Sequence, residues 1–184
     1  DLKARGLEDI LIACTDNLKG FTQAISAVFP DAVTQICIVH QIRNSCRFVV
    51  WGDRKEFCRD LKKVYTAINA KIAVEELEKF KTKWSVKYKY AITSWEENWD
   101  NLSNYFEYPL ELRRIIYTTN TIENLNRGIR KYTKTKTQFV NENAATKSIY
   151  LSIQNIEKAW AKPITNWGLI LNQFLVIFEK RCKL

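Results

Sequence analysis

The sequence predicts an α/β fold, because a strand, a helix and a second strand are followed by helices up to the end of the chain. Short apolar runs, typical of strands buried on both faces of a sheet, occur at Ile10–Cys14 and Val33–Val39. From about Gln41 onward the apolar residues recur at helical spacing instead. Strands that alternate with a helix indicate an α/β unit, to which the remaining helices are added.

Local signals bound each element in turn. The first strand should end at Asp16, and the helix after it should stop at Phe29 and Pro30, because proline ends helices. The segment from Gln41 to Tyr117 should be helical throughout, with no strand. Three further helices should begin near Asn120, near Glu142 and near Thr165.

Composition bounds the class of protein. With 46% hydrophobic residues and no low-complexity tract, the 184 residues should fold into one domain or slightly more. The five cysteines are odd in number and lack paired CxxC spacing, which indicates reduced thiols in an intracellular protein. No apolar stretch reaches the ~20 residues of a membrane span, so we expect a cytoplasmic protein. Because the chain opens at Asp1 and contains no methionine, we expect a piece of a longer protein.

The positive charge is concentrated in one segment. The net charge is +9, and residues 113–136 hold seven basic residues against a single acid, Glu123. The basic residues are Arg113, Arg114, Arg127, Arg130, Lys131, Lys134 and Lys136. A local excess of this kind indicates a surface that binds phosphates.

Asp16 is the first candidate for chemistry. It follows a buried strand, and in open α/β sheets ligands and catalytic groups collect at the carboxyl ends of the strands. Aspartate is also a preferred N-cap residue, so the alternative is that Asp16 only caps the helix after it.

Glu123 is the second candidate. It lies three residues after Asn120 at the start of a helix, where a capping-box glutamate is the structural alternative. At helical spacing Glu123 shares a face with Arg127, Arg130 and Lys134, opposite an apolar stripe. An acid that binds a metal beside cations that bind phosphates is what phosphoryl transfer on DNA needs.

Four other residues could support a site. Cys37 and His40 have the spacing of half a zinc site, but the chain has no second pair of ligands. His40, expected at a strand end, can be a polar group near an active site, a hydrogen-bonded turn residue or one half of a Cys–His nucleophilic pair. Trp95 and Trp99 should share a helix face, either in the core or stacked on an unpaired base.

Four motifs resemble the Mutator-type transposases of bacterial insertion sequences, in the order of that family. Thr15-Asp16-Asn17-Leu18-Lys19-Gly20-Phe21 is similar to the family's second-aspartate motif. The segments that follow it are Gln35 to Asn44, similar to the Cys-x-x-His motif, Tyr117 to Asn126, similar to the third-acid motif, and Asn166 to Gln173, similar to the last helix.

The resemblance implies a fold and a mechanism. The fold would be a partial RNase H-like core that lacks its first strands. Residues 1–40 would form a strand-helix-strand part of this core, 41–117 an all-helical insertion, and 118–184 its C-terminal helices. Asp16 and Glu123 would be the second and third acids of an Asp-Asp-Glu triad that holds two Mg²⁺ or Mn²⁺ ions. The DNA-binding residues would be Arg127, Arg130, Lys131, Lys134 and Lys136, and the supporting residues Cys37, His40, Asn120, Trp95 and Trp99.

The same resemblance implies partners and a location. The complete enzyme would cleave insertion-sequence ends and join them to target DNA, act as a homo-oligomer, and lie in the bacterial cytoplasm on the nucleoid. Folding should bring Asp16 and Glu123 together around a shared metal.

Two alternatives stay open at the level of sequence. No acid of the chain matches the family's first aspartate, so these residues alone should be inactive, and the chain can be a truncated remnant that only binds DNA. A purely helical interaction module is the other alternative, and it would have no sheet.

Overall fold

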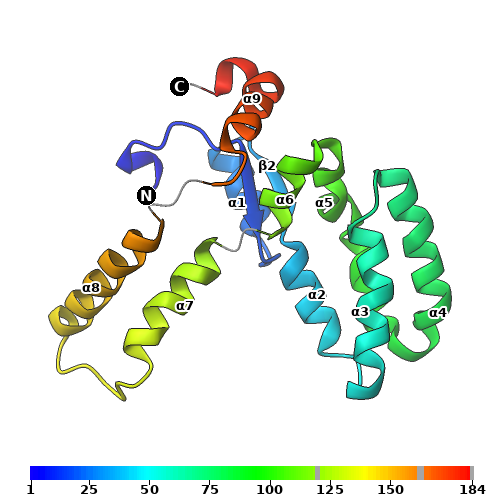
Figure 1. Cartoon of the computed structure of the whole chain (residues 1–184), viewed down its shortest axis with the longest axis horizontal. Helices are drawn as coiled ribbons and strands as arrows, with labels where there is room; N and C mark the ends of the chain where they lie inside the picture. Colours follow the sequence, from blue (N-terminus) through cyan, green and yellow to red (C-terminus); the bar gives the residue numbers. More distant parts are fainter. Residues whose placement is uncertain (119–120, 161–163, 183–184) are drawn as a thin grey trace. The chain divides into compact units, whose positions relative to one another are not determined.

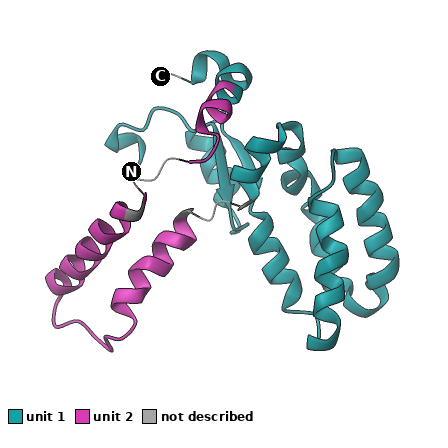
Figure 2. Ribbon diagram, in the orientation of Figure 1, with its two compact units in different colours: residues 1–118, 173–184 teal, residues 119–172 magenta. Residues whose placement is uncertain are grey.

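The computed structural model describes residues 1–118, 121–160 and 164–182. The chain divides into two compact units, shown in Figure 2. Unit 1 comprises Asp1–Thr118 and Gln173–Leu184, and unit 2 comprises Thr119–Asn172. The division into residues 1–40, 41–117 and 118–184 that the family resemblance implies stays a prediction.

A two-stranded parallel sheet lies in unit 1. Strand β1 (Ile12–Thr15) pairs with β2 (Val33–Ile36), with Ile12 opposite Val33 and Thr15 opposite Ile36. Helix α1 (Phe21–Val28) connects the two strands, ending before Pro30 as expected. The predicted strand-helix-strand order is therefore confirmed, and the purely helical alternative is wrong.

The second strand is shorter than predicted. Pairing ends at Ile36, Cys37 is the extended N-cap residue of α2 (Ile38–Cys46), and His40 lies in the first turn of that helix. The prediction that His40 stands at a strand end is thus wrong. Ile38 and Gln41, three residues apart, are both buried, so the apolar run packs as one face of a helix rather than as a strand.

The other regular elements among the described residues are helices, as Figure 1 shows. In unit 1 these are η1 (Lys3–Arg5), α3 (Trp51–Tyr65), α4 (Ala70–Glu97), α5 (Trp99–Ser103), η2 (Asn104–Glu107) and α6 (Leu110–Thr118). The later elements are α7 (Thr121–Thr133), α8 (Glu142–Trp160), α9 (Trp167–Phe178) and η3 (Glu179–Arg181). Among the described residues between 41 and 117 no strand forms, which confirms the helical interpretation of that block.

The core of the helical block is aromatic. Phe57 of α3 is fully buried and meets the rings of Phe80, Trp84 and Tyr88 edge-on, at centroid distances of 4.8, 5.5 and 5.8 Å. Edge-to-face pairs of this kind add about 0.5–1.5 kcal/mol each beyond the buried area. Apolar residues that recur at helical spacing on α3 and α4 therefore form the core of this block.

A buried glutamine joins the helical block to the sheet. The Gln35 side chain on β2 is 2% exposed; its amide donates to the carbonyl of Leu102 at 2.9 Å, and its oxygen accepts from the amide of Tyr105 at 3.0 Å. Asn104 adds a third link, because its amide donates to the carbonyl of Thr34 at 3.0 Å. The sheet and the helices after α4 are thus connected by specific polar contacts in addition to apolar packing.

Arg181, near the C-terminal end of the chain, contacts the residues that precede the two strands of the sheet. Arg181 binds both carboxylate oxygens of Asp9 at 2.9 Å and donates to the carbonyls of Ile10 and Asp31. A bidentate pair of this geometry fixes orientation as well as charge. Unit 1 is therefore built from two stretches that are distant in the sequence.

Unit 2 is centred on the antiparallel pair α7 and α8. Gly128 on α7 lies against Ile156 on α8 so closely that a Cβ there would meet the Ile156 side chain at 2.6 Å. The absence of a side chain at this position lets the two helices approach. None of the helices in the described part of the chain is long and apolar enough to span a lipid bilayer.

Candidate active site and nucleic-acid interface

Asp16 stands at the carboxyl edge of the parallel sheet. It follows the last residue of β1, Thr15, which is buried, whereas Asp16 itself is exposed. The carbonyl of Thr15 accepts a hydrogen bond from the amide of Cys37 at 2.7 Å, so the residue after each strand lies at the same edge. This is the edge at which α/β sheets place their ligands.

The fold does not use the Asp16 carboxylate as a helix cap. Helix α1 begins at Phe21, its N-cap residue is Gly20 with φ of 83°, and no side chain caps it. The N-cap interpretation of Asp16 is therefore wrong. Within the described ranges the carboxylate forms no hydrogen bond or ion pair, so it is available to a ligand.

The turn after Asp16 is held by an asparagine pair. Asn17 adopts a left-handed backbone with φ of 64°, a conformation that asparagine tolerates better than most residues. Its amide donates to the Asn98 side chain at 2.9 Å, and Asn98 in turn donates to the carbonyl of Ser94 at 2.7 Å. Asn98 thus connects the strand end to the junction of α4 and α5, and nothing in the local sequence pattern pointed to it.

Two thiols lie next to the sheet edge. Cys14 donates a weak hydrogen bond to the carbonyl of Ile116 at 3.7 Å, and Cys37 is buried. Burial, with a contribution from the neighbouring Cys37, raises the pKa of Cys14 to about 11 although part of the residue is exposed. A thiol that stays protonated is a poor nucleophile and a poor metal ligand. None of the five cysteines, all of which lie within the described residues, forms a disulfide.

Glu123 lies in the first turn of α7, in unit 2. Asn120, its expected partner in a capping box, lies outside the described residues. Asp16 belongs to unit 1 and Glu123 to unit 2, so their meeting around a metal stays a prediction.

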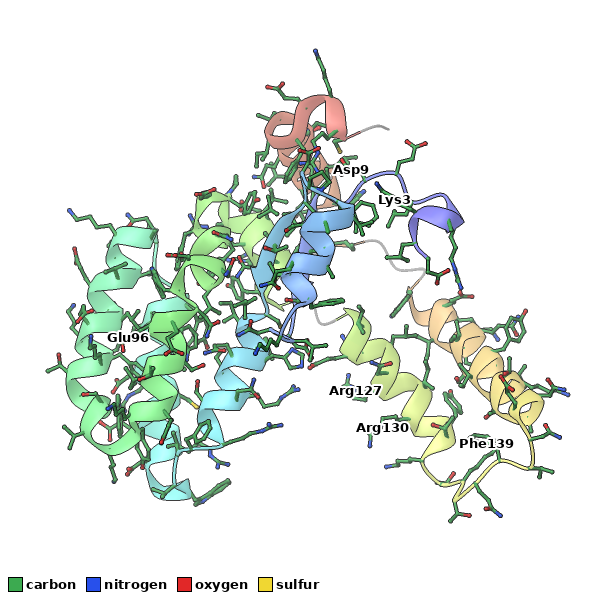
Figure 3. The ribbon with its side chains drawn as sticks, turned by 180° about the vertical axis from the view of Figure 1, so that it is seen from behind. Lys3, Asp9, Glu96, Arg127, Arg130 and Phe139 are labelled. Atoms are coloured by element: carbon green, nitrogen blue, oxygen red, sulfur yellow. The ribbon has the colours of Figure 1, made fainter. Side chains whose placement is uncertain are left out.

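The basic residues of α7 and the turn after it form the expected charged surface. Arg127, Arg130, Lys131, Lys134 and Lys136 are all exposed or partly exposed. Figure 3 shows Arg127 and Arg130 pointing away from α8. Arg127 is oriented by a hydrogen bond to Asn124 at 3.1 Å, and Lys136 lies 5.2 Å from the centre of the Phe139 ring. These cations therefore line a face that α8 does not cover.

Arg113 does not belong to this charged surface. Its guanidinium donates to the carbonyls of Tyr108, Ile68 and Phe106 at 2.5, 2.7 and 2.7 Å. It therefore stabilises the turns around α6. The sequence-based interpretation counted Arg113 in the phosphate-binding segment, and the structure corrects this. The sequence contained no sign of this role, because all three acceptors are backbone carbonyls, which no side-chain pattern identifies.

The two tryptophans do not share a helix face. Helix α4 ends at Glu97, so Trp95 belongs to α4 and Trp99 opens α5. Trp95 is 1% exposed and its indole nitrogen donates to the hydroxyl of Ser45 at 2.8 Å. Trp95 is thus a core residue that no base can reach, whereas Trp99 is half-buried.

The donor chemistry at the sheet edge suits a hard divalent cation. Mg²⁺ binds through one or two carboxylates together with water and phosphate oxygens, and Asp16 offers such a carboxylate. Over the residues that the structure describes, no three His, Cys, Asp or Glu side chains gather as a metal site. Cys37 and His40 therefore do not form a zinc site within that range.

Comparison with known proteins supplies the family. The family model described as "Transposase, Mutator family" matches residues 1–163. The chain is 42% identical over 182 residues to the probable transposase for insertion sequence element ISRM3-like of Sinorhizobium fredii and to the transposase for insertion sequence element ISRM3 of Rhizobium meliloti; each match covers 98% of this chain and 46% of the relative.

A more distant relative shows the same match. The transposase for insertion sequence element IS905 of Lactococcus lactis is 38% identical over 143 residues, which cover 78% of this chain and 36% of the relative. The chain thus spans about half or less of the length of these curated relatives. It belongs to the Mutator family of transposases.

Proposed function

We propose that the chain is the C-terminal part of the catalytic region of an insertion-sequence transposase that cleaves DNA and transfers the cut strand. The names of its relatives support this function, and one observation on the structure carries the site. The carboxylate of Asp16 is exposed at the carboxyl end of β1, and no hydrogen bond from the described residues engages it. A carboxylate that is accessible in this position is available to a ligand.

In this proposal the fold is a partial RNase H-like core, and Asp16 and Glu123 are the second and third acids of an Asp-Asp-Glu triad. Each acid offers oxygen ligands to Mg²⁺ or Mn²⁺. When bound, a pair of such ions stabilises the attacking and the leaving oxygens of a phosphodiester. The first acid is assigned to no residue of this chain, so the 184 residues alone would be inactive.

The residues of α7 position the substrate. Exposed arginines and lysines bind backbone phosphates, which provides affinity and register but no sequence specificity. Glu123 opens a helix on which Arg127 and Arg130 follow at four and seven residues, so acid and cations lie along one face. Such a face would hold the phosphodiester backbone next to the acid.

The experiment compares carboxylate variants in the complete transposase, on DNA that carries the ends of the element. Asp16→Asn and Glu123→Gln should each lower strand cleavage by at least about a hundredfold, the range for losing a group that stabilises transition-state charge. Binding of the same DNA should change by less than about threefold, because amides keep the shape of the site. Asp100→Asn and Glu157→Gln, both exposed acids elsewhere, are the matched controls.

Two results would overturn the assignment. Cleavage at the normal rate by Glu123→Gln would remove this residue from the reaction. Binding without cleavage by the unaltered protein, at every concentration of Mg²⁺ and Mn²⁺, would favour the alternative of a remnant that only binds DNA.

The phosphate role of α7 has its own test. Neutralising Arg127, Arg130 or Lys134 to glutamine should reduce the slope of log affinity against log salt by ~0.9 for each phosphate that the variant no longer neutralises. Lys158→Gln on α8 is the control and should leave the slope unchanged.

A further inference from the structure

One end of the helical block exposes large apolar side chains. Helix α4 contains a non-helical residue, Tyr88, with φ of −133° and ψ of 47°, and the chain folds back there. The ion pair between Lys81 and Glu96 requires this reversal, because fifteen residues of straight helix would separate them by ~22 Å. In Figure 1 the reversal of α4 and the turn between α2 and α3 lie at the same end of the block.

The two turns meet through an aromatic pair. Phe48, in the turn after α2, stacks on Tyr90 with 6.2 Å between the ring centres and 29° between the planes. We call this end the tip and define it by five exposed apolar residues: Phe48, Val50, Trp51, Val86 and Tyr90. Trp51 is 83% exposed, Val86 97% and Tyr90 79%. Exposed clusters of large apolar side chains mark binding surfaces.

The charges around the tip select the kind of partner. Residues 43–55 and 86–90 contain six cations and one acid, Asp53. Hydrogen bonds from Lys87 and from the hydroxyl of Tyr88 lower the pKa of Asp53, so this acid is ionised and already paired. Arg54 lies 5.4 Å from the centre of the Trp51 ring, and Arg47 and Lys89 are nearby in sequence and accessible to solvent. The tip therefore complements a negatively charged partner, and the proposed function supplies DNA as that partner.

Aromatic rings interleaved with cations distinguish unpaired from paired DNA. In a duplex the bases are stacked on each other and only phosphates reach such a surface, whereas unpaired bases offer their faces to aromatic side chains. The α7 surface differs, because within its described residues Lys136 lies beside a single ring, Phe139, and no stacked pair like Phe48 and Tyr90 occurs there. We propose that the tip binds unpaired DNA, with bases stacked on Trp51 and on the Phe48–Tyr90 pair and with phosphates on Arg47 and Lys89.

This inference rests on the proposed function, because that function supplies DNA as the partner. The test uses the 184-residue chain and two labelled probes, an oligothymidine of about 20 nucleotides and a blunt duplex of about 20 base pairs, followed by fluorescence anisotropy. Trp51→Ala should weaken binding of the single strand about tenfold, and Trp51→Phe should keep it within about threefold, since stacking on one ring accounts for an effect of that size. Both variants should bind the duplex within about twofold of the unaltered chain.

Matched controls separate the tip from a general loss of structure. Ile68, 79% exposed in the turn between α3 and α4, is the apolar control, and Ile68→Ala should change neither affinity. Lys89→Gln should lower the salt slope for the single strand by ~0.7, whereas Lys71→Gln in the first turn of α4 should leave it unchanged. Because Trp51 is so exposed, its substitutions should leave the far-ultraviolet circular dichroism spectrum unaltered.

Each remaining outcome is decisive. Unchanged affinity for the single strand in Trp51→Ala, or an equal loss on both probes, would overturn the proposal. So would a change of oligomeric state without a change in DNA binding, which would make the tip a contact between copies of the chain. Glu157→Gln, an exposed acid outside the proposed site, should bind oligothymidine normally. A failure of the catalytic assignment would show in cleavage by the carboxylate variants of the complete transposase, and a failure at the tip only in binding of the single strand.

Discussion

Replacing Gln35 by leucine should measure how strongly the helical block is attached to the sheet. The substitution keeps the approximate size of the side chain and removes its amide. It therefore removes three hydrogen bonds at a residue that is 2% exposed: those that Gln35 donates to the carbonyls of Leu102 and Ile36, and the one that it accepts from the amide of Tyr105. The effect on the attachment should come from Leu102 and Tyr105, the two partners in the helical block, rather than from a cavity.

The magnitude follows from the two hydrogen bonds. A buried polar group without its partner costs about 1–3 kcal/mol, so two such groups cost about 2–6 kcal/mol. The additional apolar burial of leucine offsets roughly 1 kcal/mol, at ~25 cal/mol per Å². The free energy of unfolding should therefore fall by about 1–5 kcal/mol. With an m-value of about 2–3 kcal/mol/M, the midpoint in urea should fall by about 1 M.

The assay is urea unfolding, followed by far-ultraviolet circular dichroism and by tryptophan fluorescence. Gln23→Leu is the control, since Gln23 is exposed on α1 and its replacement should change the free energy of unfolding by less than about 0.5 kcal/mol. An unchanged midpoint and slope in Gln35→Leu would refute the reasoning, because the amide would then contribute nothing to the attachment.

Two glycines and a thiol provide further predictions. Gly128→Ala should destabilise unit 2 by about 1 kcal/mol, because its Cβ would lie 2.6 Å from Ile156 and the cost of overpacking exceeds the helix propensity of alanine; adding Ile156→Val, which removes the Cδ1 atom that the new Cβ would meet, should recover part of the loss. Gly52→Ala, with open space at the Cβ position, should instead raise the melting temperature by stabilising α3 by about 0.5–1 kcal/mol, and a loss there would contradict the geometry. Burial and the hydrogen bond with Cys58, at 3.2 Å between sulfurs, raise the pKa of Cys46 to about 11, so its alkylation by iodoacetamide, mapped by mass spectrometry, should accelerate with pH until about pH 11. A plateau near the ordinary thiol pKa of about 8.5 would show that Cys46 is not shielded.

The sequence predicted the elements that depend on local patterns. The apolar runs, the proline after α1 and the helical stripes determined the strand-helix-strand order and the helical block, because each signal acts within one or two turns of the chain. Boundaries were less certain, as the residues after Ile36 show: an apolar run suits a strand or a buried helix face, and only the packing of Ile38 and Gln41 decided between them. The prediction for His40 failed for the same reason.

The roles of single side chains depended on distant partners. Arg113 belongs to a basic segment in the sequence, yet its three carbonyl acceptors make it structural. Trp95 and Trp99 have the spacing of one helix face, but the end of α4 at Glu97 separates them. Whether Asp16 caps a helix depended on where α1 begins, and that position follows from the left-handed turn at Gly20.

By itself the sequence determined the family, the α/β order and the helical block. It also identified the acids and cations to test, because motifs and periodicity depend only on residues close to each other along the chain. Only the tertiary structure decided which side chains remain available at the surface. Asn17 contacts Asn98 across 81 residues, and Gln35 contacts Leu102 across 67. The exposed tip likewise exists only because two separate turns fold against each other. Burial and partnership are properties of the packed chain, in which residues far apart in sequence compete for the same contacts, so no local pattern can encode them.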